Sequence, residues 1–165
     1  MELMSGNEAI AQGAWEAGCT IGVAYPGTPS TETLEAFAKK EGVYAEWCVN
    51  EKVAVEVGIG ASAAGARVLA TMKHVGVNVA ADPLFTAAYT GVGGGLVVLA
   101  ADDPGPISSQ TEQDTRQFAE FANLPVFDPS SPEEAYRMIQ DAFDYSEKYQ
   151  TPVLFRPTTR ICHGC

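Results

Sequence analysis

The sequence has little of what would assign it to several common functional classes. It carries 10 Lys and Arg residues against 21 Asp and Glu residues, a formal net charge of −11. Such a charge repels phosphate backbones and anionic lipid, so we expect neither nucleic acid nor a membrane surface as a partner. No run of about 18 uncharged apolar residues is present, and the start MELMSGNEAI lacks the basic end of a signal peptide. We therefore expect a cytoplasmic protein.

Recognisable catalytic and metal-binding motifs are also missing. The patterns GxSxG, HExxH and the P-loop are absent, and GVGGG at residues 91–95 precedes an apolar run instead of following one, unlike a dinucleotide fingerprint. Cys19 and Cys48 lie in or beside apolar runs, which is typical of buried thiols. The CHGC at residues 162–165 offers too few ligands for zinc or an iron–sulfur cluster. We expect no metal site in this chain.

What the sequence does contain is a regular alternation of helical patterns and short apolar runs. Its 165 residues, 46% of them hydrophobic, are enough for one domain with a core, which we place at residues 1–165. Helical patterns at 5–18, 31–40, 51–64, 79–89, 112–121 and from 131 onward are interleaved with apolar runs at 20–25, 44–49, 67–72, 93–101, 124–128 and 152–156. This alternation predicts an α/β fold with a doubly wound, mainly parallel sheet of about six strands and helices on both faces.

Polar residues are concentrated directly after the expected strands. PGTPST, NEK, KHVGVN and DDPGPISSQTEQD each follow an apolar run, and we interpret residues 103–111 as loop. Because parallel strands all end at the same edge of a sheet, these four segments converge on one rim, where ligands bind in such folds. For any single segment, helix capping is the more common explanation. The four together favour a site, and the helix N-termini there favour an anionic ligand.

Three residues of this rim have side chains suited to chemistry. Asn50 is the expected N-cap of a helix, which places Glu51 in the first turn. Glu51 either complements the helix dipole or hydrogen-bonds a ligand nitrogen and tunes its protonation. Lys73 and His74 could bind an anion or serve as acid or base, although no catalytic triad surrounds the histidine.

Several segments of the chain resemble a known family. SGNEAIAQGAWEAG, AYPGTPSTE, NEKVAVEVGIGASAAGARVLATMKHVGVNVAADP and DDPGPISSQTEQDTR are together similar to the N-terminal pyrimidine-binding domain of the 2-oxoacid:ferredoxin oxidoreductases. Within this thiamine diphosphate family the chain most strongly resembles the alpha subunits of the indolepyruvate ferredoxin oxidoreductases. MKHVGVNVAADP and SSQTEQDTR are the most specific segments, and the resemblance covers essentially the whole chain.

The resemblance implies a cofactor and roles for individual residues. Thiamine diphosphate would bind between two doubly wound domains, of which this chain resembles the one that holds the aminopyrimidine ring. Glu51 matches the family's glutamate that bonds a pyrimidine ring nitrogen, which makes it the expected catalytic residue. Thr28 matches the threonine that faces the substrate carboxylate. The other expected cofactor contacts are Gly27, Lys73, His74 and Asn78.

The resemblance also implies a reaction and partners. The reaction is the oxidative decarboxylation of a 2-oxo acid, an aryl pyruvate such as indolepyruvate, to acyl-CoA with electrons passed through [4Fe-4S] clusters to ferredoxin. The chain has neither the Gly-Asp-Gly motif that holds Mg²⁺ and the diphosphate nor ferredoxin-like cysteine runs. We therefore expect a fragment of a longer subunit, inactive alone. Its expected partners are a diphosphate-binding domain, a smaller beta subunit, ferredoxin and coenzyme A, and we also expect a homodimer.

Two alternatives stay open at the level of the sequence. The chain could be the pyrimidine-binding subunit of a non-oxidative thiamine-dependent 2-oxoacid decarboxylase, which the gene downstream of Cys165 would distinguish. It could also be a non-catalytic assembly module that docks a partner through its acidic surface. In that case a change of Glu51 to Gln would leave function intact.

Overall fold

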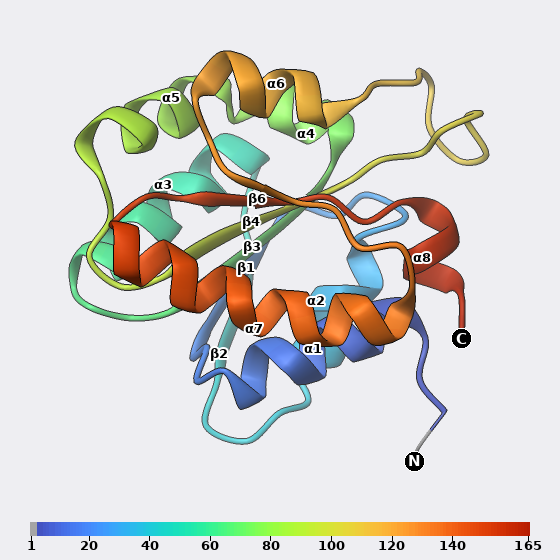
Figure 1. The fold of residues 1–165 in the computed structure, drawn as a ribbon, viewed down its shortest axis with the longest axis horizontal. Coiled ribbons are helices and arrows are strands. Elements are labelled where there is room, and N and C mark those ends of the chain that lie inside the picture. Colours follow the sequence, from blue (N-terminus) through green and yellow to red (C-terminus); the bar gives the residue numbers. More distant parts are fainter. Residues whose placement is uncertain (1–2) are drawn as a thin grey trace.

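A computed structural model describes residues 3–165 as a six-stranded sheet with helices on both faces (Figure 1). The strands are β1 (Ile21–Ala24), β2 (Tyr44–Trp47), β3 (Val68–Lys73), β4 (Leu96–Ala101), β5 (Val126–Phe127) and β6 (Val153–Phe155). Their order is β2-β1-β3-β4-β6-β5, and every neighbouring pair is parallel. The predicted α/β class and strand number are therefore confirmed.

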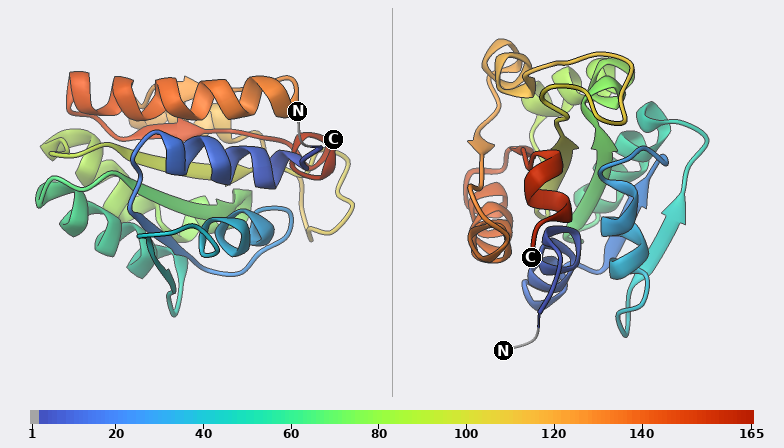
Figure 2. Two further views of the ribbon diagram at one scale, coloured as in Figure 1. Left: turned by 90° about the horizontal axis from the view of Figure 1, so that it is seen from below. Right: turned by 90° about the vertical axis from the view of Figure 1, so that its right-hand side faces the viewer.

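The helices are divided between the two faces of the sheet. One face is covered by α1 (Gly6–Glu16), α2 (Thr31–Phe37), α7 (Pro132–Tyr149) and α8 (Thr159–His163). The other is covered by α3 (Glu51–Ala63), α4 (His74–Val79), α5 (Ala81–Thr90) and α6 (Thr115–Ala122). Figures 1 and 2 show these two helical layers with the sheet between them. Among residues 3–165, no helix is long and apolar enough to cross a membrane.

Alternating strand residues supply the two halves of the core. Leu69 and Leu99 point to the face of α1 and α7, whereas Val68, Ala70 and Val98 pack on the face of α3 and α5. All six residues of β4 are buried. A strand that is covered on both faces must be apolar throughout, because successive side chains point to opposite faces. This explains why the central strands appear in the sequence as continuous apolar runs.

Capping residues set three helix starts as predicted. Ser5 and Glu8 form a reciprocal capping box at α1, and the side chains of Asn50 and Ser131 accept amide hydrogen bonds at the starts of α3 and α7. The helix expected from residue 112 begins only at Thr115, because the Asp114 side chain caps it.

Two further segments differ from the sequence prediction. The residues KHVGVN, expected as a polar rim segment before a helix at 79–89, are themselves mostly helical: α4 begins at His74, directly after β3, and α5 follows at Ala81. Cys162 and His163 of the terminal CHGC end a short helix, α8, which the sequence pattern did not predict. Six and five residues are too few to display a helical period, so packing and not local pattern identifies these helices.

The contact between α1 and α7 depends on a glycine. A Cβ atom added to Gly13 would lie 2.4 Å from the carbonyl oxygen of Tyr136 and 2.6 Å from Cγ2 of Ile139. Gly60, on the exposed side of α3, offers a matched control because an added Cβ meets no atom within 4 Å.

Gly13→Ala should therefore destabilise the domain by roughly 1 to 3 kcal/mol, since the two helices must move apart. Gly60→Ala should instead stabilise it by about 0.5 to 1 kcal/mol, because alanine loses less backbone entropy in a helix. Urea unfolding followed by circular dichroism measures both changes. Equal effects of the two substitutions would contradict the close α1–α7 packing.

Candidate functional site

The strand order reverses beside β1. The chain passes from β1 outward to β2, then crosses back over β1 to β3 and continues to β4. The segments that leave β1 and β3 therefore turn to opposite faces of the sheet, and in doubly wound folds the ligand-binding crevice lies at such a point, at the carboxyl ends of the two strands. Gly27 follows β1 and Lys73 ends β3, and a Cβ atom on Gly27 would lie 3.1 Å from Cγ of Lys73. The two predicted residues thus lie in contact across the crevice.

Glu51 begins α3 at the same edge and is only 8% exposed. Its carboxylate packs on the backbone of α4, where a Cβ atom added to Gly76 would lie 2.6 Å from Oε1 of Glu51. Within residues 3–165, the Glu51 carboxylate forms no hydrogen bond and no ion pair. A buried carboxylate without a donor is energetically costly. Glu51 is therefore available to a ligand that brings its own N–H group.

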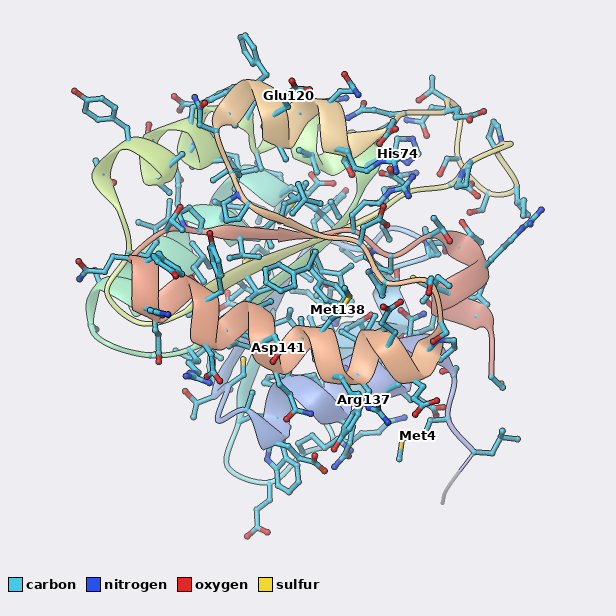
Figure 3. All side chains as sticks on the ribbon, in the orientation of Figure 1. Met4, His74, Glu120, Arg137, Met138 and Asp141 are labelled. Carbon is cyan, nitrogen blue, oxygen red and sulfur yellow. The ribbon has the colours of Figure 1, made fainter. Side chains whose placement is uncertain are left out.

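His74 and Asn78 lie on α4, the helix on which Glu51 packs. The imidazole of His74 is fully buried, and neither ring nitrogen has a partner among the described residues. Asn78 is exposed and exchanges hydrogen bonds of 2.9 and 3.1 Å with the side-chain amide of Gln113, which precedes α6. Gln113 also donates to the carbonyl oxygen of His74 at 3.4 Å. Figure 3 shows His74 on the opposite side of the sheet from Met4 and Arg137.

Thr28 lies in the turn between β1 and α2 and is exposed. The turn is closed by the hydroxyl of Thr31, which accepts from the Gly27 amide at 2.9 Å, and by Ser30 Oγ, which donates to the Gly27 carbonyl at 2.8 Å. The peptide bond between Thr28 and Pro29 is cis. The Thr28 hydroxyl itself makes no hydrogen bond with any residue in 3–165, so it is available at the mouth of the crevice.

Two aspartates after β4 are used for structure. Asp102 is fully buried and accepts from Arg156 Nε at 2.7 Å and from the Thr115 amide at 3.0 Å, which joins the ends of β4 and β6 to α6. Sequence reasoning placed these acids in a ligand-binding rim and missed Arg156, whose partner is 54 residues distant. The only sequence signal for the pair was a charged residue at the end of each of two buried strands.

Asp103 organises the loop that follows. Its Oδ2 accepts from the amides of Ile107, Ser108 and Ser109 at 2.9 to 3.0 Å, and its Oδ1 accepts from the Thr159 hydroxyl at 2.7 Å. Burial acts to raise the pKa of Asp103. The hydrogen bonds from Ser108 and Thr159 outweigh burial and hold this pKa well below its usual range.

The four cysteines form neither a disulfide nor a metal site among the described residues. Cys19, Cys48 and Cys162 are buried and Cys165 is exposed, all as free thiols. Burial raises the pKa of Cys19 to about 12 and also raises that of Cys162, so both buried thiols are unreactive. In the part of the chain that the structure describes, no three His, Cys, Asp or Glu side chains are placed to hold a metal ion. A hollow of about 650 Å³ lies between α1 and α7, and none of the predicted site residues lines it.

Comparisons with known proteins identify a family that matches this chain. Residues 12–163 match the family described as "Pyruvate flavodoxin/ferredoxin oxidoreductase, thiamine diP-bdg". The chain belongs to this family. The match covers the crevice, Glu51 and the loop after β4, so these features form part of a thiamine diphosphate-binding family domain.

Individual relatives in the family are longer than this chain. It is 53% identical to indolepyruvate oxidoreductase subunit IorA of Pyrococcus horikoshii over 98% of this chain and 25% of that protein. It is 32% identical to 2-oxoglutarate synthase subunit KorA of Methanocaldococcus jannaschii over 99% of this chain and 47% of that protein. The chain thus spans about a quarter of the length of the IorA relatives that it matches.

A solved structure shares the fold. The 2-oxoglutarate:ferredoxin oxidoreductase from Magnetococcus marinus, with 2-oxoglutarate, coenzyme A and succinyl-CoA bound, superposes with a TM-score of 0.88 at 23% sequence identity. The superposition covers 97% of this chain and 30% of that one. The two chains therefore share the same fold over this region.

Asp103→Asn should destabilise the domain at neutral pH. The variant keeps one acceptor oxygen but loses the charge on which three amides converge, which should cost roughly 1.5 to 3 kcal/mol. Because the folded-state pKa of Asp103 is lowered, its contribution is complete above about pH 4, the pKa of an unfolded aspartate, and is lost as the pH falls further. The deficit of the variant should therefore shrink in acid.

Urea unfolding at pH 7 and at stepwise lower pH measures this difference. Asp141→Asn is the matched control, since Asp141 is exposed on α7. A deficit that is independent of pH down to the acid transition would show that the Asp103 charge does not stabilise the loop.

Proposed function

We propose that this chain is the aminopyrimidine-binding domain of the alpha subunit of a thiamine diphosphate-dependent indolepyruvate ferredoxin oxidoreductase. The family match and the 53% identity to subunit IorA support the family and the substrate class. The observation that carries the proposal is Glu51, a buried carboxylate at the crevice with no donor from the described chain. The proposal includes that the chain, residues 1–165, is one domain of a longer subunit.

The residues at the crevice fit the cofactor's aminopyrimidine ring. Glu51 offers an acceptor oxygen that no residue in 3–165 uses, and Gly76 lets the carboxylate lie directly on α4 because any side chain there would collide with it. Gly27 and Lys73 border the same crevice. His74 and Asn78 lie on α4, the helix on which Glu51 packs. Their contact with the cofactor is still a prediction.

Glu51 has one function in the proposed mechanism. Thiamine diphosphate, when bound, supplies a carbon nucleophile for the carbonyl group of a 2-oxo acid and an electron sink for loss of carbon dioxide. The Glu51 carboxylate accepts a hydrogen bond at a pyrimidine ring nitrogen and shares its proton, which sets the protonation state of the ring. Its low exposure excludes competing water and strengthens this hydrogen bond.

Thr28 acts on the substrate in this proposal. Its hydroxyl is exposed at the mouth of the crevice, in a turn held by Ser30 and Thr31, so it can donate to the carboxylate of a bound 2-oxo acid without rearrangement of the turn. A hydrogen bond to an ionised acceptor is about twice as strong as a neutral one. This position therefore suits recognition of the group common to all 2-oxo acids.

The remaining parts of the enzyme are assigned to other domains. A diphosphate-binding domain would supply the Mg²⁺ site, and [4Fe-4S] clusters elsewhere would carry electrons to ferredoxin while coenzyme A accepts the acyl group. The expected smaller beta subunit, the homodimer and the cytoplasmic location stay predictions. Subunit IorA and subunit KorA are named as parts of larger enzymes, which supports the need for partner subunits.

Glu51→Gln in the assembled enzyme tests the proposal. Glutamine keeps the shape but cannot share a proton in the same way, so kcat should fall roughly 100-fold or more at saturating thiamine diphosphate. Reduction of ferredoxin by an aryl pyruvate and coenzyme A measures this rate. Glu56→Gln, five residues further along α3 and exposed, is the matched control and should retain activity. Full activity of Glu51→Gln would favour a non-catalytic assembly module.

A further inference from the structure

Lys73 is held in a defined position at the crevice. It ends β3, and its aliphatic stem lies over Gly27, whose added Cβ would meet Cγ at 3.1 Å and Cδ at 3.3 Å. A residue larger than glycine at position 27 would displace this stem. The ammonium group is directed to the loop after β4, where Nζ donates to Oε1 of Gln110 at 3.3 Å. Three segments of the rim thus meet at one lysine.

The charge of Lys73 is not neutralised by the chain. The ion pairs of residues 3–165 engage Lys52, Arg67, Arg116, Arg137, Arg156 and His163, and Lys73 takes part in none of them. Its described partner is a neutral amide oxygen at a long distance, although the whole chain carries 21 acidic residues. Two acids, Asp102 and Asp103, directly follow β4. They already accept hydrogen bonds from Arg156, Thr159 and loop amides.

A second observation points to a ligand at the same place. The Glu51 carboxylate, more than nine-tenths buried, has no donor within the described chain and packs on α4, which begins next to Lys73. An unused acceptor and an unpaired cation therefore flank one crevice. Glu51 therefore favours a ligand group that donates a hydrogen bond, and Lys73 favours a separate ligand group with a negative charge.

We infer that Lys73 provides the positive charge that binds the carboxylate of the 2-oxo acid, next to the Thr28 hydroxyl, and that Gln110 holds the ammonium group in place. This inference rests on the proposed function. It assigns specificity for an ionised substrate to this domain, whereas Glu51 acts on the cofactor. A Cβ atom at Gly27 would press on the lysine stem, which would have to shift by a few tenths of an ångström.

Steady-state kinetics of the assembled enzyme test the inference. Lys73→Gln should raise KM for the aryl pyruvate roughly 10-fold or more, the effect of losing one charged hydrogen bond, and should change kcat much less. Lys73→Arg keeps the charge and should restore part of the affinity. Lys148→Gln, an exposed lysine near the end of α7, is the matched control and should leave KM unchanged.

Inhibitors separate charge recognition from a loss of structure. An arylacetate should inhibit the wild-type enzyme more strongly than the neutral arylacetamide, and Lys73→Gln should abolish this preference while the arylacetamide binds as before. Weaker binding of both inhibitors would indicate a deformed site and would overturn the inference.

The cofactor's diphosphate is the other anion that could face Lys73. In that case Lys73→Gln would raise the thiamine diphosphate concentration needed for half-maximal activity and leave KM for the aryl pyruvate unchanged, which would overturn the inference. An unchanged KM for both would also overturn it, while the proposed function would stand. If the wild-type enzyme showed no thiamine-dependent turnover, the proposed function and this inference would fail together.

Discussion

The reversal of strand order beside β1 determines where the other features of this domain lie. Because β2 and β3 flank β1 on opposite sides, the turn after β1 and the helix after β3 must separate toward opposite faces of the sheet. In doubly wound folds the ligand-binding crevice lies between these two segments. Gly27 and Lys73 border this crevice, and α4 continues from Lys73 to support the carboxylate of Glu51.

The acidic side chains near this edge differ in whether the chain itself supplies their hydrogen-bond donors. Asp102 and Asp103 are buried and hydrogen-bonded, and they fix the ends of β4 and β6 and the loop between β4 and α6, although Oδ1 of Asp102 has no partner among the described residues. Glu51 is nearly as buried but has no partner in the described chain. A buried charge that is paired stabilises the fold together with its partner, because removing either one leaves an uncompensated buried charge. A buried charge without a partner is better explained by binding to a ligand, which is why the proposed function depends on Glu51.

Much of the fold could be predicted from the sequence, since the signals were local. Continuous apolar runs predicted β3 and β4, and Ser5, Asn50 and Ser131 predicted helix starts, because a cap acts within three residues of itself. The short helices α4 and α8 could not be predicted in this way. The ion pair between Arg156 and Asp102 could not be predicted either, because its partners lie 54 residues apart and local sequence patterns do not indicate such distant contacts.

The sequence by itself determined the α/β class, the residues that bring chemistry to the rim and the family to which the chain belongs. These properties follow from side-chain type and short-range spacing, which are present in the linear chain. Only the tertiary structure decided which rim residues stay available. Asp103 and Glu51 look alike in the sequence, but five donor groups converge on the former and none in the described chain on the latter. The free energy of a buried charge depends on the groups that folding brings around it, and these lie far apart along the chain.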